Sequence, residues 1–306
     1  MKIAFVILHY EGLEDTKECL ASLQKYINQH DKRNNDNVKG CERKSGADKS
    51  SESDKIEIVV VDNGSVNGKL SQIEDDYKDT DSIHFLYSSQ NLGFAKGNNI
   101  GFAYAKNVLK AEIILLCNND LVFKDDEFVE KLVRSYQQDK YDVAGPKTIS
   151  LVDGKNQNPI PYQYPRIKDV DVRIIKSQIL YWLSFIGLDV WLQKIVSKEI
   201  TEFHPEENEE YQLFGACLIF TKRYIDLFDG LYDGTFMYGE ESILKERVID
   251  HSLKMQYLDM LEVYHKEGSS TGVKYGQGKR KRQFYYRWSI HSCRLLKKMK
   301  EEKGES

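Results

Sequence analysis

Apolar residues occur along this chain in short continuous runs that alternate with segments of helical periodicity. Four early runs have strand length and no polar side, as in strands buried on both faces of a sheet, namely 3–8, 56–61, 83–87 and 112–117. Apolar residues recur at helical spacing in 13–27, 94–109 and 126–138. Later strands are predicted near 143–144, at 213–220 and at 255–264. This alternation predicts an α/β protein with a Rossmann-like, mostly parallel sheet and helices on both faces.

Three other segments depart from this alternation. Residues 30–55 are almost wholly polar and charged, which predicts a flexible surface insertion; a functional lid is the alternative. Residues 153–165 contain three of the five prolines and are predicted to form a loop. An apolar helical stripe in 174–196 favours core or partner contact over a membrane surface, and it consists of Trp182, Phe185, Leu188, Trp191, Leu192 and Ile195.

The composition, with 41% hydrophobic and 30% charged residues, is that of a globular protein with a core. The five cysteines are scattered and form no CxxC pair, which favours a reducing cytosol over a disulfide framework. The chain shows no signal peptide and no apolar run of about eighteen residues. We therefore expect a cytoplasmic protein without a membrane span.

The net charge of −4 conceals a strongly basic C-terminal segment, since residues 274–303 contain eleven Lys and Arg against two Glu. Basic and aromatic residues are interleaved there, which suits an anionic leaflet and predicts peripheral association with the inner face of the plasma membrane. RNA binding uses similar residues, but the acidic remainder of the chain opposes a nucleic-acid partner. A solvated helix is the remaining alternative. We predict a basic, helical extension over 273–306.

Polar residues follow three of the early strands at the point where each strand ends. The clusters are His9-Tyr10-Glu11, Asp62-Asn63-Gly64-Ser65 and Asn118-Asn119-Asp120. Because the carboxyl ends of parallel strands share one edge of a sheet, these clusters are expected to converge on one ligand crevice. One carboxylate with two amides suits a Mg²⁺ or Mn²⁺ held mainly by substrate phosphates and water. An ordinary turn is the alternative, because Asn and Asp are common turn residues.

Residues 91–101 form a glycine- and asparagine-rich helix start between the second and third clusters. Gly93 and Gly97 would let backbone approach a ligand closely, and the helix N-terminus favours an anion, to which Lys96 could add a charge. The spacing is neither GxGxxG nor a GK[ST] P-loop, so dinucleotide binding and the usual NTPase site do not fit. The alternative is that these glycines serve packing alone.

Two later segments carry further candidate residues. Glu240 and Glu241 follow an aromatic cluster and a glycine, where a carboxylate beside a second acid can have a raised pKa and act as a general base. They also suit the N-terminus of a helix, and both roles are compatible. His265 stands at the end of the last predicted strand, where a single histidine is a ligand only with support from other residues.

Taken together, these segments resemble the family 2 glycosyltransferases, in particular the rhamnosyltransferase-like branch that builds bacterial surface polysaccharides. The resemblance spans residues 2–290 and is carried, in order, by 56–65, 91–101, 115–120, 214–218, 238–241 and 265–269. It implies a GT-A fold, a nucleoside-diphosphate sugar donor, Mg²⁺ or Mn²⁺, and inversion at the anomeric carbon. On this basis residues 1–272 form the GT-A domain, with a nucleotide-binding half at 1–122 and an acceptor half at 123–272.

The resemblance also implies roles for individual residues. Asp62 would contact the nucleobase in a pocket lined by Tyr10 and Glu11, and Asn119 would lie near the ribose. Asp120 occupies the last position of the family's DxD-type motif and would hold the metal, with His265 completing the site. The other residues expected to bind the nucleotide sugar are Asn63, Asn91, Gly93, Lys96, Asn98 and Asn118.

Two departures from the family pattern affect these roles. Asn118 and Asn119 replace acids found in many members, which lowers the negative charge available to a metal. Glu241 stands where the family usually has its catalytic Asp, and Glu240 could be the base instead.

The resemblance implies transfer of a sugar from dTDP-rhamnose or a UDP-hexose to a hydroxyl of a glycan or lipid-linked acceptor in cell-surface polysaccharide synthesis. The alternatives are a sugar nucleotidyltransferase, which would carry a glycine-rich signature followed by a basic pair near the N-terminus, and a non-catalytic nucleotide-sugar-binding subunit.

Overall fold

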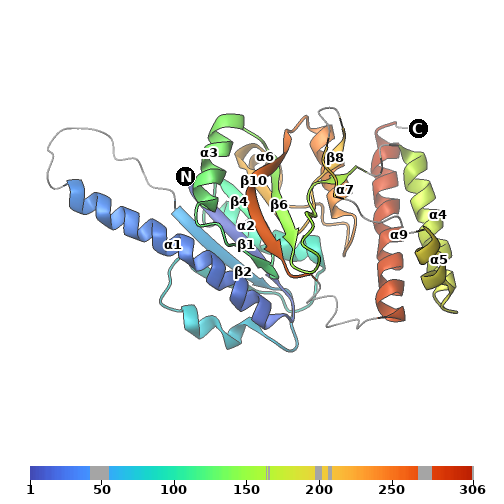
Figure 1. Ribbon diagram of the computed structural model, residues 1–306, viewed down its shortest axis with the longest axis horizontal. Coiled ribbons are helices and arrows are strands. Elements are labelled where there is room, and N and C mark those ends of the chain that lie inside the picture. Colours follow the sequence, from blue (N-terminus) through green and yellow to red (C-terminus); the bar gives the residue numbers. More distant parts are fainter. Residues whose placement is uncertain are drawn as a thin grey trace.

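The computed structural model describes residues 1–41, 55–162, 164, 166–196, 202–205, 209–267 and 278–304. Its centre is an eight-stranded sheet, shown in Figure 1. Across the sheet the order is β3 (Ile83–Tyr87), β2 (Lys55–Asp62), β1 (Lys2–His9), β4 (Ile113–Asn118), β9 (Cys217–Thr221), β6 (Val143–Ser150), β10 (Met255–His265) and β5 (Leu121–Val122). A separate pair consists of β7 (Ile160–Pro161) and β8 (Tyr211–Gln212).

Most strand pairs in the sheet are parallel. Strands β1 to β4 run in one direction and β10 runs parallel to β6, whereas β9 is antiparallel to β4 and β6, and β5 to β10. The register pairs His9 with Asp62 and Leu8 with Asn118. The predicted mostly parallel sheet is confirmed, and three of its polar strand ends lie side by side.

Helices cover both faces of the sheet because the strand residues alternate between two apolar clusters. Phe5 and its alternate neighbours pack against α1 (Leu13–Cys41) and α3 (Phe128–Asp139). Val6 and its alternates pack against α2 (Phe94–Asn107), α6 (Lys222–Leu227) and α7 (Glu240–Asp250). Between β2 and β3 the chain forms two short 3-10 helices, η1 (Leu70–Gln72) and η2 (Glu74–Tyr77).

Three further helices form a layer at one end of the molecule (Figure 1). This helical layer consists of α4 (Ile167–Leu183), α5 (Leu188–Val196) and the C-terminal α9 (Lys279–Glu302). Its own small core joins Val170 and Ile174 of α4 to Cys293 and Leu296 of α9, with Ile243 contributed by α7. The predicted helical, basic extension is therefore present, and it packs against the rest of the chain.

Two element predictions differ from the structure. The first helix continues to Cys41, so the expected insertion begins as helix; this polar stretch lacks proline, and extending an existing helix costs little. Residues 42–54 of that insertion lie outside the described residues. The apolar stripe forms two helices separated by a turn at Gly187, whose φ is +80°.

The stripe does not belong to the core of the chain. Trp182 is 70% exposed and Trp191 64% exposed. Because the break at Gly187 turns α5 away from the direction of α4, one continuous helical face does not form.

Two findings bear on compartment and membrane. Four cysteines lie in the described residues, namely Cys19, Cys117, Cys217 and Cys293, and all four are buried free thiols. No helix in the described parts of the chain combines the length and apolarity needed to cross a bilayer.

Candidate active site

The polar strand ends converge on one cavity of about 260 Å³ at the carboxyl edge of the sheet. Its walls come from the ends of β1, β2, β4 and β10, the start of α2, the segment before β9 and the start of α7. Ten residues predicted from the sequence line it, namely Tyr10, Asn63, Asn91, Gly93, Asn118, Asn119, Asp120, Glu240, Glu241 and His265. The fold thus brings these ten residues, which are spread along the sequence from Tyr10 to His265, into a single site.

Asp120 and His265 form a buried pair in this cavity. Nε2 of His265 lies 3.3 Å from Oδ1 of Asp120, and Nδ1 lies 2.8 Å from Oε1 of Gln157. The backbone N–H of Lys266 donates to the carbonyl of Asp120 over 3.0 Å, which joins the residue after β10 to the segment between β4 and β5. The pair is therefore held by backbone as well as by side-chain contacts.

This pair has the chemistry of a partial divalent-metal site. A carboxylate and an imidazole are both ligands of Mn²⁺, and Mg²⁺ in nucleotide sites is often held by one or two carboxylates plus phosphate oxygens and water. Within the described residues no group of three or more His, Cys, Asp or Glu could hold a metal. The residues present fit a metal whose remaining ligands come from a diphosphate and water.

Asn119 ties the site to the start of α1. Its Nδ2 donates to the carbonyl of Gly12 over 3.1 Å and to Oγ1 of Thr16 over 2.9 Å. The same Thr16 hydroxyl lies 2.7 Å from Nδ1 of the fully buried His9. Burial lowers the pKa of His9, which keeps this ring neutral. These contacts give Asn119 a positioning role in addition to its place in the cavity wall.

Asn63 organises the loop that leads into α2. Its Oδ1 accepts the N–H of Leu92 over 2.9 Å, and its Nδ2 donates to the carbonyl of Gly93 over 3.0 Å. Gly93 has a φ of +85°, and a Cβ there would lie 2.2 Å from the carbonyl oxygen of Phe236. The N–H of Phe94 donates to that same carbonyl over 2.7 Å, so the start of α2 is joined to the loop before α7.

Two predicted nucleotide-binding acids shape loops next to the cavity. Asp62 accepts the N–H of Ser65 over 2.8 Å and the N–H of Leu70 over 3.3 Å. Both carboxylate oxygens of Glu11 accept backbone N–H groups, from Val66 and Asn67. Neither acid is among the residues that line the cavity. Their predicted contacts with a nucleobase remain predictions.

Two other predicted residues also lie outside the cavity wall. Lys96 is exposed and lines a neighbouring cavity of about 710 Å³. Asn98 is buried, and its Nδ2 donates to the carbonyl of Phe94 within the first turn of α2. Asn98 therefore makes a contact within its own helix, and Lys96 lines the neighbouring cavity instead of the candidate active site.

Glu240 and Glu241 begin α7 after Gly239, whose φ of +90° turns the chain into the helix. Glu240 is buried and accepts the hydroxyl of Thr235 over 3.0 Å. Burial and the neighbouring Glu241 raise the pKa of Glu240 to about 7. Burial also raises the pKa of Glu241, although backbone N–H groups, including that of Gly215, oppose this shift. Glu241 is the more exposed of the two within the cavity.

Several residues of the site had not been singled out from the sequence. Gln157, which contacts His265, lies in the proline-containing loop, where nothing in the sequence marks one amide among many. Phe214, Phe236 and Tyr238 line the cavity, and the ring of Phe214 meets that of His265 edge-to-face at 5.8 Å. Aromatic residues directly beside the acidic pair are a signal that could have identified Phe236 and Tyr238.

The fold is that of an α/β protein in which the Asp120–His265 pair and the Glu240–Glu241 pair line one crevice. The model of glycosyl transferase family 2 matches residues 6–196, which is more than half of the chain. The chain therefore belongs to glycosyltransferase family 2.

Individual relatives agree with this family. The low-salt glycan biosynthesis hexosyltransferase Agl10 of Haloferax volcanii is 24% identical over 213 residues, covering 69% of this chain and 59% of Agl10. The chain thus matches about three fifths of the length of that relative.

Solved structures resemble the fold at lower sequence identity. S. aureus TarS 1–349 in complex with UDP has a TM-score of 0.53 and 15% identity, covering 87% of this chain and 60% of that one. The mannosyltransferase PcManGT from Pyrobaculum calidifontis, in complex with GDP-Man and Mn²⁺, has a TM-score of 0.50 and 10% identity, covering 98% and 75%. These likenesses, with the sheet topology, confirm the predicted GT-A type fold.

Proposed function

We propose that this protein is an inverting, metal-dependent glycosyltransferase that moves a sugar from a nucleoside-diphosphate sugar to an acceptor hydroxyl. One observation carries the proposal: the Asp120–His265 pair and the Glu240–Glu241 pair line the same cavity. A site for a diphosphate-bound cation beside a carboxylate that can accept a proton suits transfer from such a donor.

The donor would bind along the sheet edge, with its diphosphate near Asp120 and its nucleoside toward Tyr10 and Asn63. Backbone-anchored amides such as Asn63 provide a rigid wall for this purpose, because their hydrogen bonds to the 91–93 loop fix their orientation. The first donors to test are dTDP-rhamnose and UDP-hexoses. GDP-mannose joins them, because one of the structural neighbours was solved with it.

In the transfer step, Glu241 accepts the proton of the acceptor hydroxyl while the hydroxyl oxygen forms a bond to the anomeric carbon. The bond from that carbon to the diphosphate oxygen breaks on the opposite face, which inverts the configuration. A Mg²⁺ or Mn²⁺ held by Asp120 and His265 would supply Lewis-acid neutralisation of the departing diphosphate. Glu240, with a pKa of about 7, remains largely protonated below neutral pH and so places no second full charge beside the base.

The acceptor we propose is a glycan or a lipid-linked saccharide of cell-surface polysaccharide synthesis, reached at the cytoplasmic face of the membrane. Agl10, by name a hexosyltransferase of glycan biosynthesis, supports this class of acceptor. The reduced, buried cysteines fit a reducing compartment.

The test is incubation of the purified protein with Mn²⁺ and a panel of dTDP-, UDP- and GDP-sugars, with detection of free nucleoside diphosphate and sugar. A glycosyltransferase hydrolyses its own donor slowly and produces the nucleoside diphosphate. A nucleotidyltransferase instead produces nucleoside triphosphate from added pyrophosphate, and a non-catalytic subunit binds a donor without turnover. Glu241→Gln should remove donor turnover; a loss with Glu240→Gln alone would assign the base to Glu240.

A further inference from the structure

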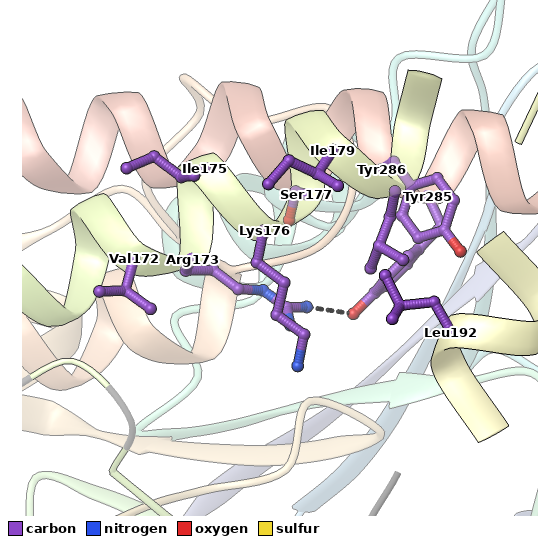
Figure 2. Close-up of a pocket in the computed structure, with 10 residues that line it drawn as sticks. Val172, Arg173, Ile175, Lys176, Ser177, Ile179, Leu192, Tyr285 and Tyr286 are labelled. Carbon is purple, nitrogen blue, oxygen red and sulfur yellow. Dashed lines mark hydrogen bonds between the residues drawn. The ribbon is translucent and has the colours of Figure 1, made fainter. Parts of the chain in front are cut away.

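A second, largely apolar pocket lies within the helical layer, away from the sheet (Figure 2). It has a volume of about 490 Å³ and lies among α4, α5 and α9. Half of its ten lining residues are aliphatic, namely Val172, Ile175, Ile179, Leu180 and Leu192. Such a wall favours hydrocarbon, because apolar surface gains free energy when it leaves water.

A cation lies in the wall of this pocket. Arg173 reaches from α4 toward α9, where its Nη2 donates to the hydroxyl of Tyr285 over 2.5 Å (Figure 2). Its Nε is buried and has no hydrogen-bond partner among the described residues. The guanidinium carries a full charge at any physiological pH. A partly buried cation without an anionic partner is costly, so the pocket favours a ligand that supplies negative charge.

No carboxylate of the described chain neutralises this cation. None of the ion pairs among the described residues includes Arg173, and the titratable groups that interact with it are the hydroxyls of Tyr285 and Tyr164 and the thiol of Cys293. Lys176 also lines the pocket, and its exposed ammonium makes no ion pair within the described residues. Two uncompensated cations beside an aliphatic wall complement an anionic head attached to a hydrocarbon chain.

A small third cavity shares wall residues both with this pocket and with the candidate active site. Arg173 and Tyr285 also line a cavity of about 190 Å³. Glu241 and Tyr238 belong to the walls of both that small cavity and the catalytic cavity. An anionic group bound at Arg173 therefore lies one small cavity away from the residue that we place as the base.

We propose that this pocket binds an anionic amphiphile, with a phosphate-type head on Arg173 and a hydrocarbon chain against α4 and α5. The ligand is then the lipid carrier of the acceptor, and this identification rests on the proposed function. Trp182, near the C-terminal end of α4, is a further exposed apolar side chain outside the pocket wall, with 70% of its surface exposed.

The direct test is titration calorimetry of the full-length protein with decyl phosphate, below the concentration at which it forms micelles. We expect one site per chain, with binding at least tenfold tighter than for decanol, since a charge-assisted hydrogen bond is lost with the alcohol. Inorganic phosphate alone should bind far more weakly because it buries no hydrocarbon. Equal affinity for decanol and decyl phosphate would overturn the assignment of the head to Arg173.

Variants locate the ligand. Arg173→Gln should weaken decyl phosphate binding about tenfold or more while leaving decanol binding unchanged, and Arg173→Lys should restore part of the loss. Ile179→Glu, at a half-exposed wall position, should weaken both ligands. Ile186→Glu is the matched control, because Ile186 is exposed on the same layer but does not line the pocket.

Other occupants give different results. If the apolar face is only a membrane surface, Ile179→Glu and Ile186→Glu should reduce co-sedimentation with phosphatidylglycerol vesicles equally, and decyl phosphate should show no single site. If a second copy of the chain covers it, sedimentation velocity should show self-association that Ile179→Glu abolishes. Either result contradicts the amphiphile pocket. Donor hydrolysis, measured separately, tests the proposed function without reference to this pocket.

Discussion

The sheet edge and the helical layer satisfy their buried polar groups in different ways. At the sheet edge, Asn63, Asp62 and Asn119 bond chiefly to backbone groups of neighbouring loops. In the helical layer, charged side chains of distant segments pair with each other, as in the Arg282–Asp189 contact of 2.6 Å between α9 and α5. The amide contacts of Asn63 and Asn119 involve no titrating group, whereas ion pairs depend on both salt and pH. The packing of the helical layer should therefore respond more strongly to salt and pH than these amide contacts at the sheet edge.

The ion pairs also change the interpretation of the basic C-terminal segment. Lys300 and Glu246 are each only 2% exposed and lie 2.6 Å apart, joining α9 to α7. Lys303 contacts the same Glu246 over 2.9 Å, and Lys297 contacts Asp171 of α4 over 2.7 Å. Part of the positive charge of this segment is therefore neutralised within the chain. Its predicted association with an anionic membrane remains a proposal that rests on the other basic residues.

The largest effect is expected at the sheet edge. Asp120→Ala should reduce donor turnover and transfer about 10³-fold or more, because the Asp120–His265 pair loses the carboxylate that we propose to hold the cation. Far-UV circular dichroism should change little, because the backbone hydrogen bond from Lys266 to the carbonyl of Asp120 does not need the side chain. The matched control is Glu127→Gln, an exposed carboxylate that does not line the cavity, which should keep full activity. An active Asp120→Ala protein would contradict the metal assignment.

In the helical layer, the largest effect should be on stability instead of chemistry. Glu246→Leu removes the anion that two lysines share, and we expect a loss of about 3–5 kcal/mol in the free energy of unfolding. Adding Lys300→Leu should recover a substantial part of that loss, because the buried lysine is removed as well. Urea unfolding measures both. Lys298→Met is the control: it is 71% exposed and should change stability by less than about 0.5 kcal/mol.

The two regions also differ in how far the sequence predicts them. Strand runs that end in polar residues identified six residues of the catalytic cavity, because parallel strands place their carboxyl ends together whatever the details of packing; these are Tyr10, Asn63, Asn118, Asn119, Asp120 and His265. The pairing of α9 with α4 and α7 had no such signal. Lys300 and Glu246 are 54 positions apart, and any of the eleven basic residues in 274–303 could have met that carboxylate.

Exposure was the other property that periodicity could not predict. The stripe that contains Trp182 has the spacing of a buried helix face, yet the structure leaves Trp182 largely exposed. Periodicity reports which side chains share a face, and only the tertiary arrangement decides whether another element covers that face. The same argument applies to Glu11 and Asp62: their position after a strand was predicted, whereas their hydrogen bonds to the loop depend on the path of residues 65–70.

A smaller effect is expected from a methyl group at the start of α2. Gly93→Ala would place a Cβ 2.2 Å from the carbonyl of Phe236, at a φ of +85° that disfavours a side chain. We expect a loss of about 1–3 kcal/mol in unfolding free energy and weaker donor binding, because the loop before α2 or the loop before α7 must shift. Gly154→Ala is the control, since it also has a positive φ but open space around it. Thermal melts and donor titration measure both variants, and equal behaviour would contradict the steric argument.

The last prediction separates the regions by the sign of their pH dependence. Lys300, Lys303 and Tyr162 lower the pKa of Glu246 despite its burial. The stabilising effect of Glu246 is therefore present above its pKa in the unfolded chain, which is near 4.5, and it is lost as pH falls.

The pH dependence of Glu240 has the opposite sign. Burial and Glu241 raise its pKa to about 7, so its contribution is complete below 4.5 and is lost as pH rises to 7. Glu240→Gln imitates the protonated carboxyl and should stabilise the protein at pH 8 by roughly 1–3 kcal/mol, with little change at pH 4.5. Urea midpoints of wild type, Glu240→Gln and the exposed control Glu127→Gln at these two pH values measure it. If the urea midpoints of all three proteins change in parallel between the two pH values, Glu240 is already ionised in the folded state. The site would then carry a second negative charge beside Glu241.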